Sequence, residues 1–354
     1  MNLYTNNKYM EDLFLVANEK LPWEKLEGKS LMISGATGLI GSFLIDVILE
    51  KNKIDNLNCK IYALGRNEKK ARERFFRFYK DENFNFISYD VKKPLLKKDL
   101  GSVDYILHLA SNTHPLLYST DPIGTIATNI IGLQNMLTFA VEHNVARFVF
   151  ASSNEIYGEN RGDVELFKED YCGYINCNTL RAGYPESKRC GEALCQAYIF
   201  QKGLDIIIAR LTRSYGPTMI MSDTKAVSQF IKKGMSNEDI ILKSDGTQFF
   251  SYTYMADAVS GLLWALLAGT CGEAYNIADV SGDIMLKDLA QIIANKIGKN
   301  VIFELPDVIE AAGYSKATKA RLCGEKLKKL GWKSKYDIKT GIERTLDILK
   351  ELER

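Results

Sequence analysis

The sequence has no hydrophobic run long enough to cross a membrane. Its longest apolar stretch covers residues 261–269, whereas a transmembrane helix needs about 20 consecutive apolar residues. Residues 1–16 carry acidic and polar side chains where a signal peptide has its apolar segment. We therefore expect a cytoplasmic protein that has no membrane partner.

An excess of charge of one sign is also missing. The 46 Lys and Arg residues nearly balance the 44 Asp and Glu residues, which leaves a formal net charge of +2. Strong attraction to nucleic acid is therefore not expected. Hydrophobic residues make up 46% and charged residues 25% of the chain. This composition excludes disordered and collagen-like classes and indicates an ordinary globular protein.

Closely spaced cysteine pairs are missing as well. The 7 cysteines are an odd number scattered over 354 residues, so we expect free thiols in a reducing compartment rather than a disulfide scaffold. Cys172 and Cys177, like Cys190 and Cys195, are spaced more widely than the usual cysteine pairs of zinc sites. We therefore expect no metal.

Strand and helix patterns alternate through the first two thirds of the chain. Short, mostly non-alternating apolar strands separated by helices indicate a parallel sheet covered on both faces. The fold class expected is therefore α/β, a doubly wound (Rossmann) sheet whose ligands lie beyond the carboxyl ends of its strands. The predicted strands cover residues 31–33, 61–64, 84–89, 105–109, 148–150 and 206–209.

Three regions follow from this pattern. Residues 1–28 form an N-terminal helical extension, with a helical period over residues 8–20. Residues 29–214 form the dinucleotide-binding Rossmann domain, to which a later segment near 238–268 returns. Residues 215–354 have a looser pattern of helices and short strands, which predicts a smaller mixed lobe.

A glycine-rich loop joins the first strand to an amphipathic helix. In such a loop the first glycine allows a tight turn, the second lets the backbone approach a pyrophosphate, and the third lets the helix pack on the sheet. This context predicts a dinucleotide site. The loop reads Gly35-Ala36-Thr37-Gly38-Leu39-Ile40-Gly41, of which all but Ala36 are candidate cofactor contacts.

The Gly-x-x-Gly-x-x-Gly spacing resembles that of the extended short-chain dehydrogenase/reductases, the NAD-dependent epimerase/dehydratase family. Two later segments match this family and are further candidate cofactor contacts: Asp90-Val91 after the third strand, where the adenine rests, and Leu109-Ala110-Ser111 after the fourth. The resemblance implies an NAD or NADP cofactor that is retained through the catalytic cycle.

Arg66 stands at the end of the second strand, where NAD enzymes have an acidic residue for the ribose 2′-hydroxyl. It is either a partner for the 2′-phosphate of NADP or a solvated surface arginine. At this position the sequence is therefore compatible with both NAD and NADP.

Tyr184-Pro185-Glu186-Ser187-Lys188 is the second strong motif. Pro185 fits the first turn of a helix that Gly203 ends, so Tyr184 and Lys188 share one helix face. The ammonium, together with a positively charged nicotinamide, is expected to lower the pKa of Tyr184 below its usual value of about 10. A phenolate can then take the proton of a sugar hydroxyl while hydride leaves the same carbon.

The run Ser153-Asn154-Glu155 follows the fifth strand. In the extended family the residue at Ser153 hydrogen-bonds the reacting hydroxyl, dehydratases continue with Asp-Glu, and decarboxylases continue with Ser-Glu. Glu155 can act as a base near carbon 5 of the sugar, or it is a helix-entry or surface carboxylate. Asn154 cannot donate the proton that expels water, which counts against dehydration.

Three longer stretches, 108–132, 181–192 and 210–217, resemble those of UDP-glucuronate decarboxylases. The wider family resemblance covers about residues 29–350. It implies a nucleotide-sugar substrate bound mainly by residues 215–354. It also implies a homodimer formed through the helices that follow Asn129 and Tyr184.

Two departures concern the charge around the substrate. Arg213 stands where most relatives have Asn, and Gln248-Phe249-Phe250 lacks an arginine with which many relatives hold the diphosphate. Arg213 or Arg321 can supply that charge. The candidate substrate contacts are Thr113, Asn154, Arg213 and Arg321.

The sequence therefore predicts an NAD(P)-dependent enzyme that acts on a nucleotide sugar through a transient 4-keto sugar, most like a UDP-glucuronate decarboxylase. A 4-epimerase, a 4,6-dehydratase and an NAD(P)H-dependent reductase of nucleotide sugars remain alternatives. A non-catalytic NAD(P)-sensing protein on the same fold is a further alternative.

Overall fold

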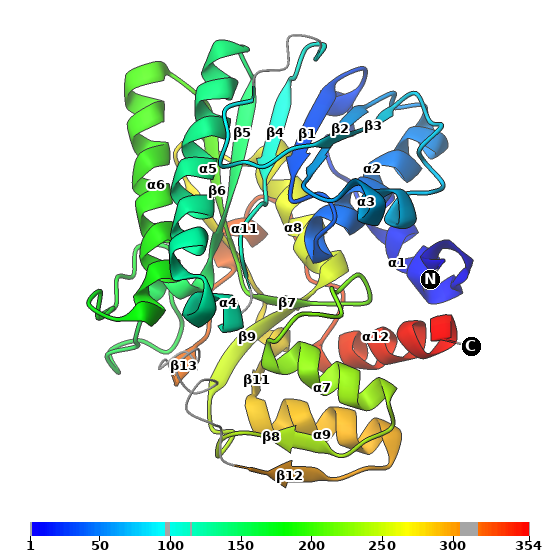
Figure 1. The fold of residues 1–354 in the computed structure, drawn as a ribbon, viewed down its shortest axis with the longest axis vertical. Helices are drawn as coiled ribbons and strands as arrows, with labels where there is room; N and C mark the ends of the chain where they lie inside the picture. Colours follow the sequence, from blue (N-terminus) through cyan, green and yellow to red (C-terminus); the bar gives the residue numbers. More distant parts are fainter. Residues whose placement is uncertain (1, 96–99, 114, 305–317, 354) are drawn as a thin grey trace.

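A parallel sheet of seven strands, in the order β10-β6-β5-β4-β1-β2-β3, organises the upper part of the molecule in Figure 1. The computed structural model describes residues 2–95, 100–113, 115–304 and 318–353. The doubly wound α/β fold expected from the sequence is confirmed. The strands are β1 Ser30–Ser34, β2 Lys60–Gly65, β3 Phe84–Ser88, β4 Tyr105–His108, β5 Arg147–Ser153, β6 Ile206–Leu211 and β10 Ala274–Ile277.

Helices cover both faces of this sheet, which is why its strands are apolar without alternation. Leu31 and Ile33 of β1 belong to the core that α2 and α8 complete. Met32, which points the other way, belongs to the core under α5 and α6. The helices of this part are α1 Asn7–Ala17, α2 Leu39–Asp55, α3 Glu68–Arg74, α4 Pro115–Thr120, α5 Pro122–Glu142, α6 Gly183–Lys202 and α8 Met255–Ala268.

The strand order reverses beside β1, because β1 pairs with β2 on one side and with β4 on the other. Such a reversal leaves a crevice beyond the carboxyl ends of the strands. The glycine loop after β1, Arg66 after β2 and Ser111 after β4 all start from this edge. The topology therefore gathers at one place segments that are far apart in the sequence.

A smaller lobe lies below this edge in Figure 1. It contains a four-stranded sheet (β7, β9, β11, β13) and a two-stranded sheet (β8, β12). The chain returns to the large sheet through α8, which lies within the expected segment 238–268, and then through β10, which lies after it. The earlier part of that segment, β8 and β9, belongs to the lobe. The elements of the lobe are β7 Arg213–Tyr215, α7 Ala226–Met235, β8 Ile240–Leu242, β9 Phe249–Tyr254, β11 Asp283–Met285, α9 Leu286–Ile297, β12 Val301–Phe303, β13 Lys319–Ala320 and α12 Ile338–Glu353. The short helix α11 Glu325–Lys328 packs on β10 of the large sheet and on α8.

None of the described helices is both long and apolar enough to span a bilayer. All 7 cysteines are free thiols. Within the described ranges, no group of three or more His, Cys, Asp or Glu side chains is arranged to hold a metal ion.

Asp12 joins the N-terminal helix α1 to the C-terminal part of the chain. The hydroxyls of Tyr254 and Tyr336 each donate to its carboxylate at 2.6 Å. Arg344 of α12 forms an ion pair with it at 2.8 Å. The Asp12 side chain is fully buried, so these three donors replace the water that the carboxylate would otherwise bind.

Replacing Asp12 with Ala should lower the free energy of unfolding by about 3 kcal/mol, because three donors lose their buried acceptor. Glu11→Ala is a matched control: Glu11 also pairs with Arg344, at 3.0 Å, but 63% of its side chain is exposed. That variant should lose less than about 0.5 kcal/mol. Denaturant unfolding followed by tryptophan fluorescence measures both, and equal losses would contradict the importance of Asp12.

Candidate active site

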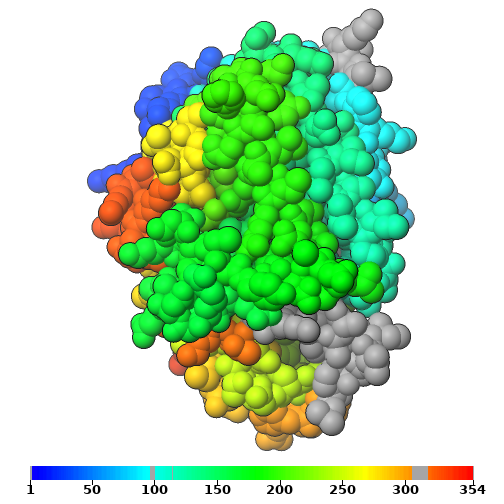
Figure 2. Space-filling model, turned by 90° about the vertical axis from the view of Figure 1, so that its left-hand side faces the viewer, coloured from blue at the N-terminus to red at the C-terminus, as the bar shows by residue number. Residues whose placement is uncertain are grey.

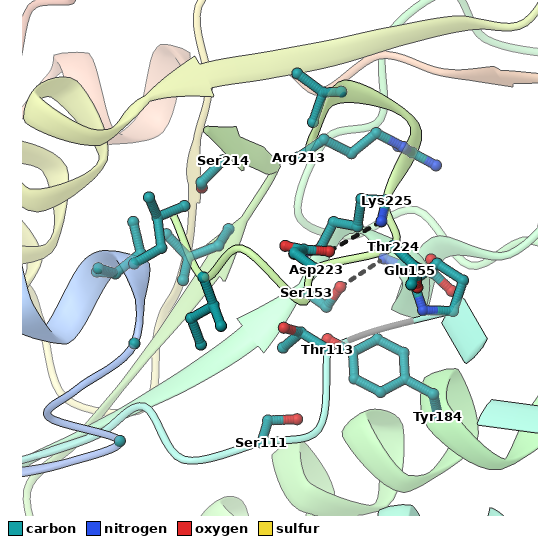
Figure 3. Close-up of a pocket in the computed structure, with 18 of the residues that line it drawn as sticks. Ser111, Thr113, Ser153, Glu155, Tyr184, Arg213, Ser214, Asp223, Thr224 and Lys225 are labelled. Carbon is teal, nitrogen blue, oxygen red and sulfur yellow. Dashed lines mark hydrogen bonds and ion pairs between the residues drawn. The ribbon is translucent and has the colours of Figure 1, made fainter. Parts of the chain in front are cut away.

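A cavity of about 760 Å³ lies at the carboxyl edge of the large sheet, between the sheet and the smaller lobe. Figure 3 shows Tyr184 on one side of this cavity and Arg213 on the other. Apart from Arg321, every candidate residue from the sequence lines it: Gly35, Thr37, Gly38, Leu39, Ile40, Gly41, Arg66, Asp90, Val91, Leu109, Ala110, Ser111, Thr113, Ser153, Asn154, Glu155, Tyr184, Lys188 and Arg213.

The glycine loop has the shape of a cradle for a pyrophosphate. Gly35 has a φ of +73°, and a Cβ there would lie 2.9 Å from the backbone nitrogen of Ala110. A Cβ on Gly41 would lie 2.5 Å from the carbonyl oxygen of Gly35. Gly38 is the N-cap of α2 and provides no side-chain hydrogen bond, so the first N–H groups of the helix are available to an anion. These residues fit a dinucleotide.

Two cationic side chains lie near the end of β2. Arg66 is exposed and lines the cavity. Lys70, on the first turns of α3, lines it as well, and burial lowers the pKa of its amine. Asn67 caps α3 by accepting the backbone N–H of Lys70. Sequence reasoning missed Lys70, although its position one turn after Arg66 was a usable signal.

A chain of hydrogen bonds joins the loop after β4 to α5 and to α6, the helix that carries the Tyr-Lys motif. Ser111 donates to the side-chain oxygen of Asn129 at 2.7 Å, and the Asn129 amide donates to Ser187 at 2.8 Å. Ser187 lies between Tyr184 and Lys188 in α6. Asn129 therefore fixes the wall of the cavity relative to the Tyr-Lys pair.

Tyr184 and Lys188 lie at the start of α6, as predicted, and Gly203 ends this helix with a φ of 66°. The ring of Tyr118 stacks on Tyr184 with the centroids 4.6 Å apart. The Lys188 amine donates to the carbonyl oxygen of Ala151 in β5 at 2.8 Å. The lysine therefore joins the helix to the strand that leads to Ser153.

In the protein chain without a nicotinamide, the pKa of Tyr184 is raised, so the expected lowering would need the charge of the cofactor as well as that of Lys188. Burial raises the pKa of Tyr184 to about 12, and hydrogen bonding from Ser153 offsets only part of this effect. Burial also lowers the pKa of Lys188 to about 8. The physical reason is that desolvation disfavours the charged form of both groups.

The carboxylate of Glu155 is mostly buried and has a charged partner. The Ser153 hydroxyl caps the short helix η3 (Asn154–Tyr157) by accepting the backbone N–H of Glu155 at 3.2 Å. The Glu155 carboxylate pairs with Arg181 at 2.5 Å. The Arg181 guanidinium also lies 4.8 Å from the centre of the Tyr118 ring. Sequence reasoning did not single out Arg181, which stands three residues before Tyr184.

The two candidate arginines for the substrate have different surroundings. Arg213 of β7 lines the cavity and lies over the ring of Phe250 at 3.6 Å. Arg321 lies outside the lining, contrary to the expectation. It donates to the buried Asp283 at 2.8 Å and lies over Phe249, so its charge is already balanced.

The smaller lobe adds polar residues to the lining that no sequence motif indicated. They come from the segment before α7, from α7 itself and from the segment after β8. They are Asp223, Thr224, Lys225, Gln229, Lys233 and Lys243.

The model of the NAD dependent epimerase/dehydratase family matches residues 31–278. Among curated proteins, UDP-glucuronic acid decarboxylase 3 of Arabidopsis thaliana is 32% identical over 88% of this chain and 86% of its own length. UDP-glucuronic acid decarboxylase 1 of Xenopus tropicalis is 32% identical over 92% of this chain and 73% of its own length.

Solved structures share the fold. The dTDP-glucose 4,6-dehydratase of Streptomyces venezuelae, solved with NAD, has a TM-score of 0.78 and 24% identity, covering 91% of this chain and 97% of its own. The UDP-glucuronic acid 4-epimerase of Bacillus cereus has a TM-score of 0.78 and 22% identity, and the match covers 91% of this chain and 99% of the epimerase chain. Because the family model spans more than half of the sequence, the chain belongs to the NAD dependent epimerase/dehydratase family.

Proposed function

We propose that the protein decarboxylates a UDP-hexuronate such as UDP-glucuronic acid, through a transient 4-keto sugar and with a nicotinamide cofactor that it retains. The observation that carries this proposal is the cavity, which combines the glycine cradle, the Tyr184–Lys188 pair, Ser153 and Glu155. The curated relatives are named for this reaction. Residues 29–214 would bind the cofactor and residues 215–354 mainly the nucleotide sugar.

Tyr184 is the proton acceptor in this proposal. When bound, oxidised NAD accepts hydride from carbon 4 of the sugar, later returns it, and brings a positive charge that favours the Tyr184 phenolate. Ser153, whose hydroxyl lies beside Tyr184, orients the reacting hydroxyl. Lys188 holds the helix and keeps a cation near the phenol. The resulting 4-ketone makes the sugar a β-keto acid, whose carboxylate can leave as carbon dioxide.

Glu155 acts later, at carbon 5. Loss of carbon dioxide leaves an enolate between carbons 4 and 5, and carbon 5 must then gain a proton. Glu155 lines the cavity, and Arg181 holds its side chain in place, so it can orient the proton donor at this carbon. The neutral Asn154 beside it cannot expel water as an acid, which argues against 4,6-dehydration.

Replacing Tyr184 with Phe should abolish oxidation of the sugar, because no group then takes the hydroxyl proton. Glu155→Gln should still oxidise carbon 4 but should slow the carbon 5 step about 100-fold, so that a 4-keto intermediate accumulates. The near-ultraviolet absorbance of reduced nicotinamide reports the first step. Mass spectrometry of the products separates loss of carbon dioxide, loss of water and no change of mass.

The matched control is Glu165→Gln, which changes an exposed glutamate outside the lining and should keep wild-type turnover. If Glu155→Gln turned over substrate at the wild-type rate and the product had the same mass as the substrate, the carbon 5 role would be contradicted. That result would favour 4-epimerisation, in which no bond at carbon 5 changes.

The cations at the end of β2 lead to a prediction about cofactor choice. Arg66→Ala should weaken NADP binding about tenfold, and Lys70→Ala should weaken it in the same direction, because both cations can pair with a 2′-phosphate. NAD binding should change by less than about twofold. Calorimetry measures both affinities; equal losses for the two cofactors would identify Arg66 as a surface arginine.

We further propose that the protein is a homodimer formed through α5 and α6. These helices pack side by side on an outer face of the molecule, which faces the viewer in Figure 2. Large apolar side chains remain exposed on them: Ile123 at 82%, Ile131 at 45% and Phe200 at 91%. Pairing with a second copy would bury such a surface.

Sedimentation equilibrium at micromolar concentration should give twice the chain mass of 39.9 kDa. Ile131→Glu should shift the protein toward monomer, since a charge in an apolar interface is costly. Val280→Glu, a change at an exposed apolar residue away from these helices, should leave the dimer intact. A monomeric wild-type protein would contradict this assembly.

A further inference from the structure

Arg213 is a cation in the cavity wall, and no acidic side chain in the described part of the chain forms an ion pair with it. It begins β7, which pairs with β9 so that Arg213 lies opposite Tyr252. The central carbon of its guanidinium lies over the ring of Phe250, 3.6 Å from the ring centre. Among the described residues, its Nη1 atom is buried and has no hydrogen-bond partner. Arginine that is stacked and desolvated in this way is prepared to bind a planar anion.

The neighbouring charges do not balance Arg213. Glu155 is bound to Arg181 at 2.5 Å, and Asp223 is bound to Lys225 at 2.7 Å, as Figure 3 shows for the second pair. Burial lowers the pKa of Arg213, as expected for a cation that lacks water and lacks a close counter-ion. A ligand that brings one negative charge would balance the charge at this point of the cavity.

The position of Arg213 indicates which part of the ligand that charge belongs to. Arg213, Glu155 and Arg181 all line the same cavity, and the charges of Glu155 and Arg181 both affect the pKa of Arg213. The proposed function places Tyr184 at carbon 4 of the sugar and Glu155 at carbon 5. The cation therefore lies on the side of the substituent at carbon 5, which is a carboxylate in a hexuronate and a neutral hydroxymethyl group in a hexose.

We infer that Arg213, stacked on Phe250, recognises the carboxylate at carbon 5 and makes the enzyme specific for nucleotide-linked hexuronates. This inference rests on the proposed function. Three lysines of the smaller lobe, Lys225, Lys233 and Lys243, also line the cavity, so the diphosphate can lie near positive charge without Arg213. The guanidinium stabilises the bound carboxylate, which becomes neutral carbon dioxide in the reaction, so its contribution should be to substrate binding and not to the rate of bond cleavage.

The test compares three ligands on the holoenzyme by calorimetry: UDP-glucuronic acid, UDP-glucose and UDP. Arg213→Met removes the charge and keeps an unbranched side chain that can pack on Phe250. Arg213→Lys keeps the charge without the planar fork. The control is Arg161→Met, which changes an exposed arginine that also lies over an aromatic ring, Tyr171, but outside the cavity lining.

Wild type and Arg161→Met should bind UDP-glucuronic acid more tightly than UDP-glucose. Arg213→Met should lose about 10- to 100-fold in affinity for UDP-glucuronic acid, because an ionic hydrogen-bonded contact is lost. Its affinities for UDP-glucose and UDP should stay within about twofold. Arg213→Lys should keep part of the preference. In steady-state assays Arg213→Met should raise KM much more than it lowers kcat.

Equal losses for all three ligands in Arg213→Met would overturn the inference, because they would place Arg213 at the diphosphate. An unchanged preference for UDP-glucuronic acid would overturn it as well. The proposed reaction is tested separately by release of carbon dioxide from wild type. A wild-type protein that prefers the uronate through Arg213 but releases no carbon dioxide would support the recognition role and contradict decarboxylation.

Discussion

The hydrogen bond from Lys188 to the carbonyl oxygen of Ala151 is the contact on which the geometry of the site depends. It joins the N-terminal part of α6 to the end of β5, and the candidate catalytic groups lie close to both ends of this contact. Tyr184 precedes Lys188 on the helix, while Ser153 ends the strand and Glu155 follows it in η3. Because this buried hydrogen bond fixes α6 relative to β5, it also restricts the distance between Tyr184 and Glu155. Asn129 provides a second connection through Ser111 and Ser187.

Burial of the Tyr184 side chain makes its phenol harder to deprotonate. A phenol that is packed under Tyr118 and removed from water holds its proton tightly, as the pKa of about 12 for Tyr184 indicates. Of the described cations in the lining, Arg181 is paired with Glu155 and Lys188 donates to the backbone, so neither is a free counter-ion for the phenolate. In the proposed mechanism, activation of Tyr184 therefore depends on charge that arrives with the bound molecules. A site of this kind stays unreactive until its ligands are in place.

Local patterns predicted the sheet, the glycine loop and the Tyr-Lys helix, because each depends on residues close together in sequence. The chain's later return to the sheet through β10 was not predicted, since the four-residue strand carries no distinctive pattern. Arg321 was a plausible substrate contact until the structure placed it against Asp283. The pairing of Glu155 with Arg181 and the stacking of Arg213 on Phe250 depend on tertiary contacts between segments, which spacing along the chain does not encode.

The buried carboxylate of Asp12 has a consequence for the order in which the molecule can be completed. Its partners Tyr254, Tyr336 and Arg344 are separated from it by most of the chain. During synthesis, α1 leaves the ribosome long before α12 is made, so Asp12 cannot form its contact with Arg344 until the end of translation. The contact between α12 and α1 therefore forms only when the C-terminal part of the chain has been made. A nascent chain that stops before residue 336 would lack Tyr336 and Arg344, so Asp12 would keep only Tyr254 of its three donors and α1 would be held less firmly than in the folded protein.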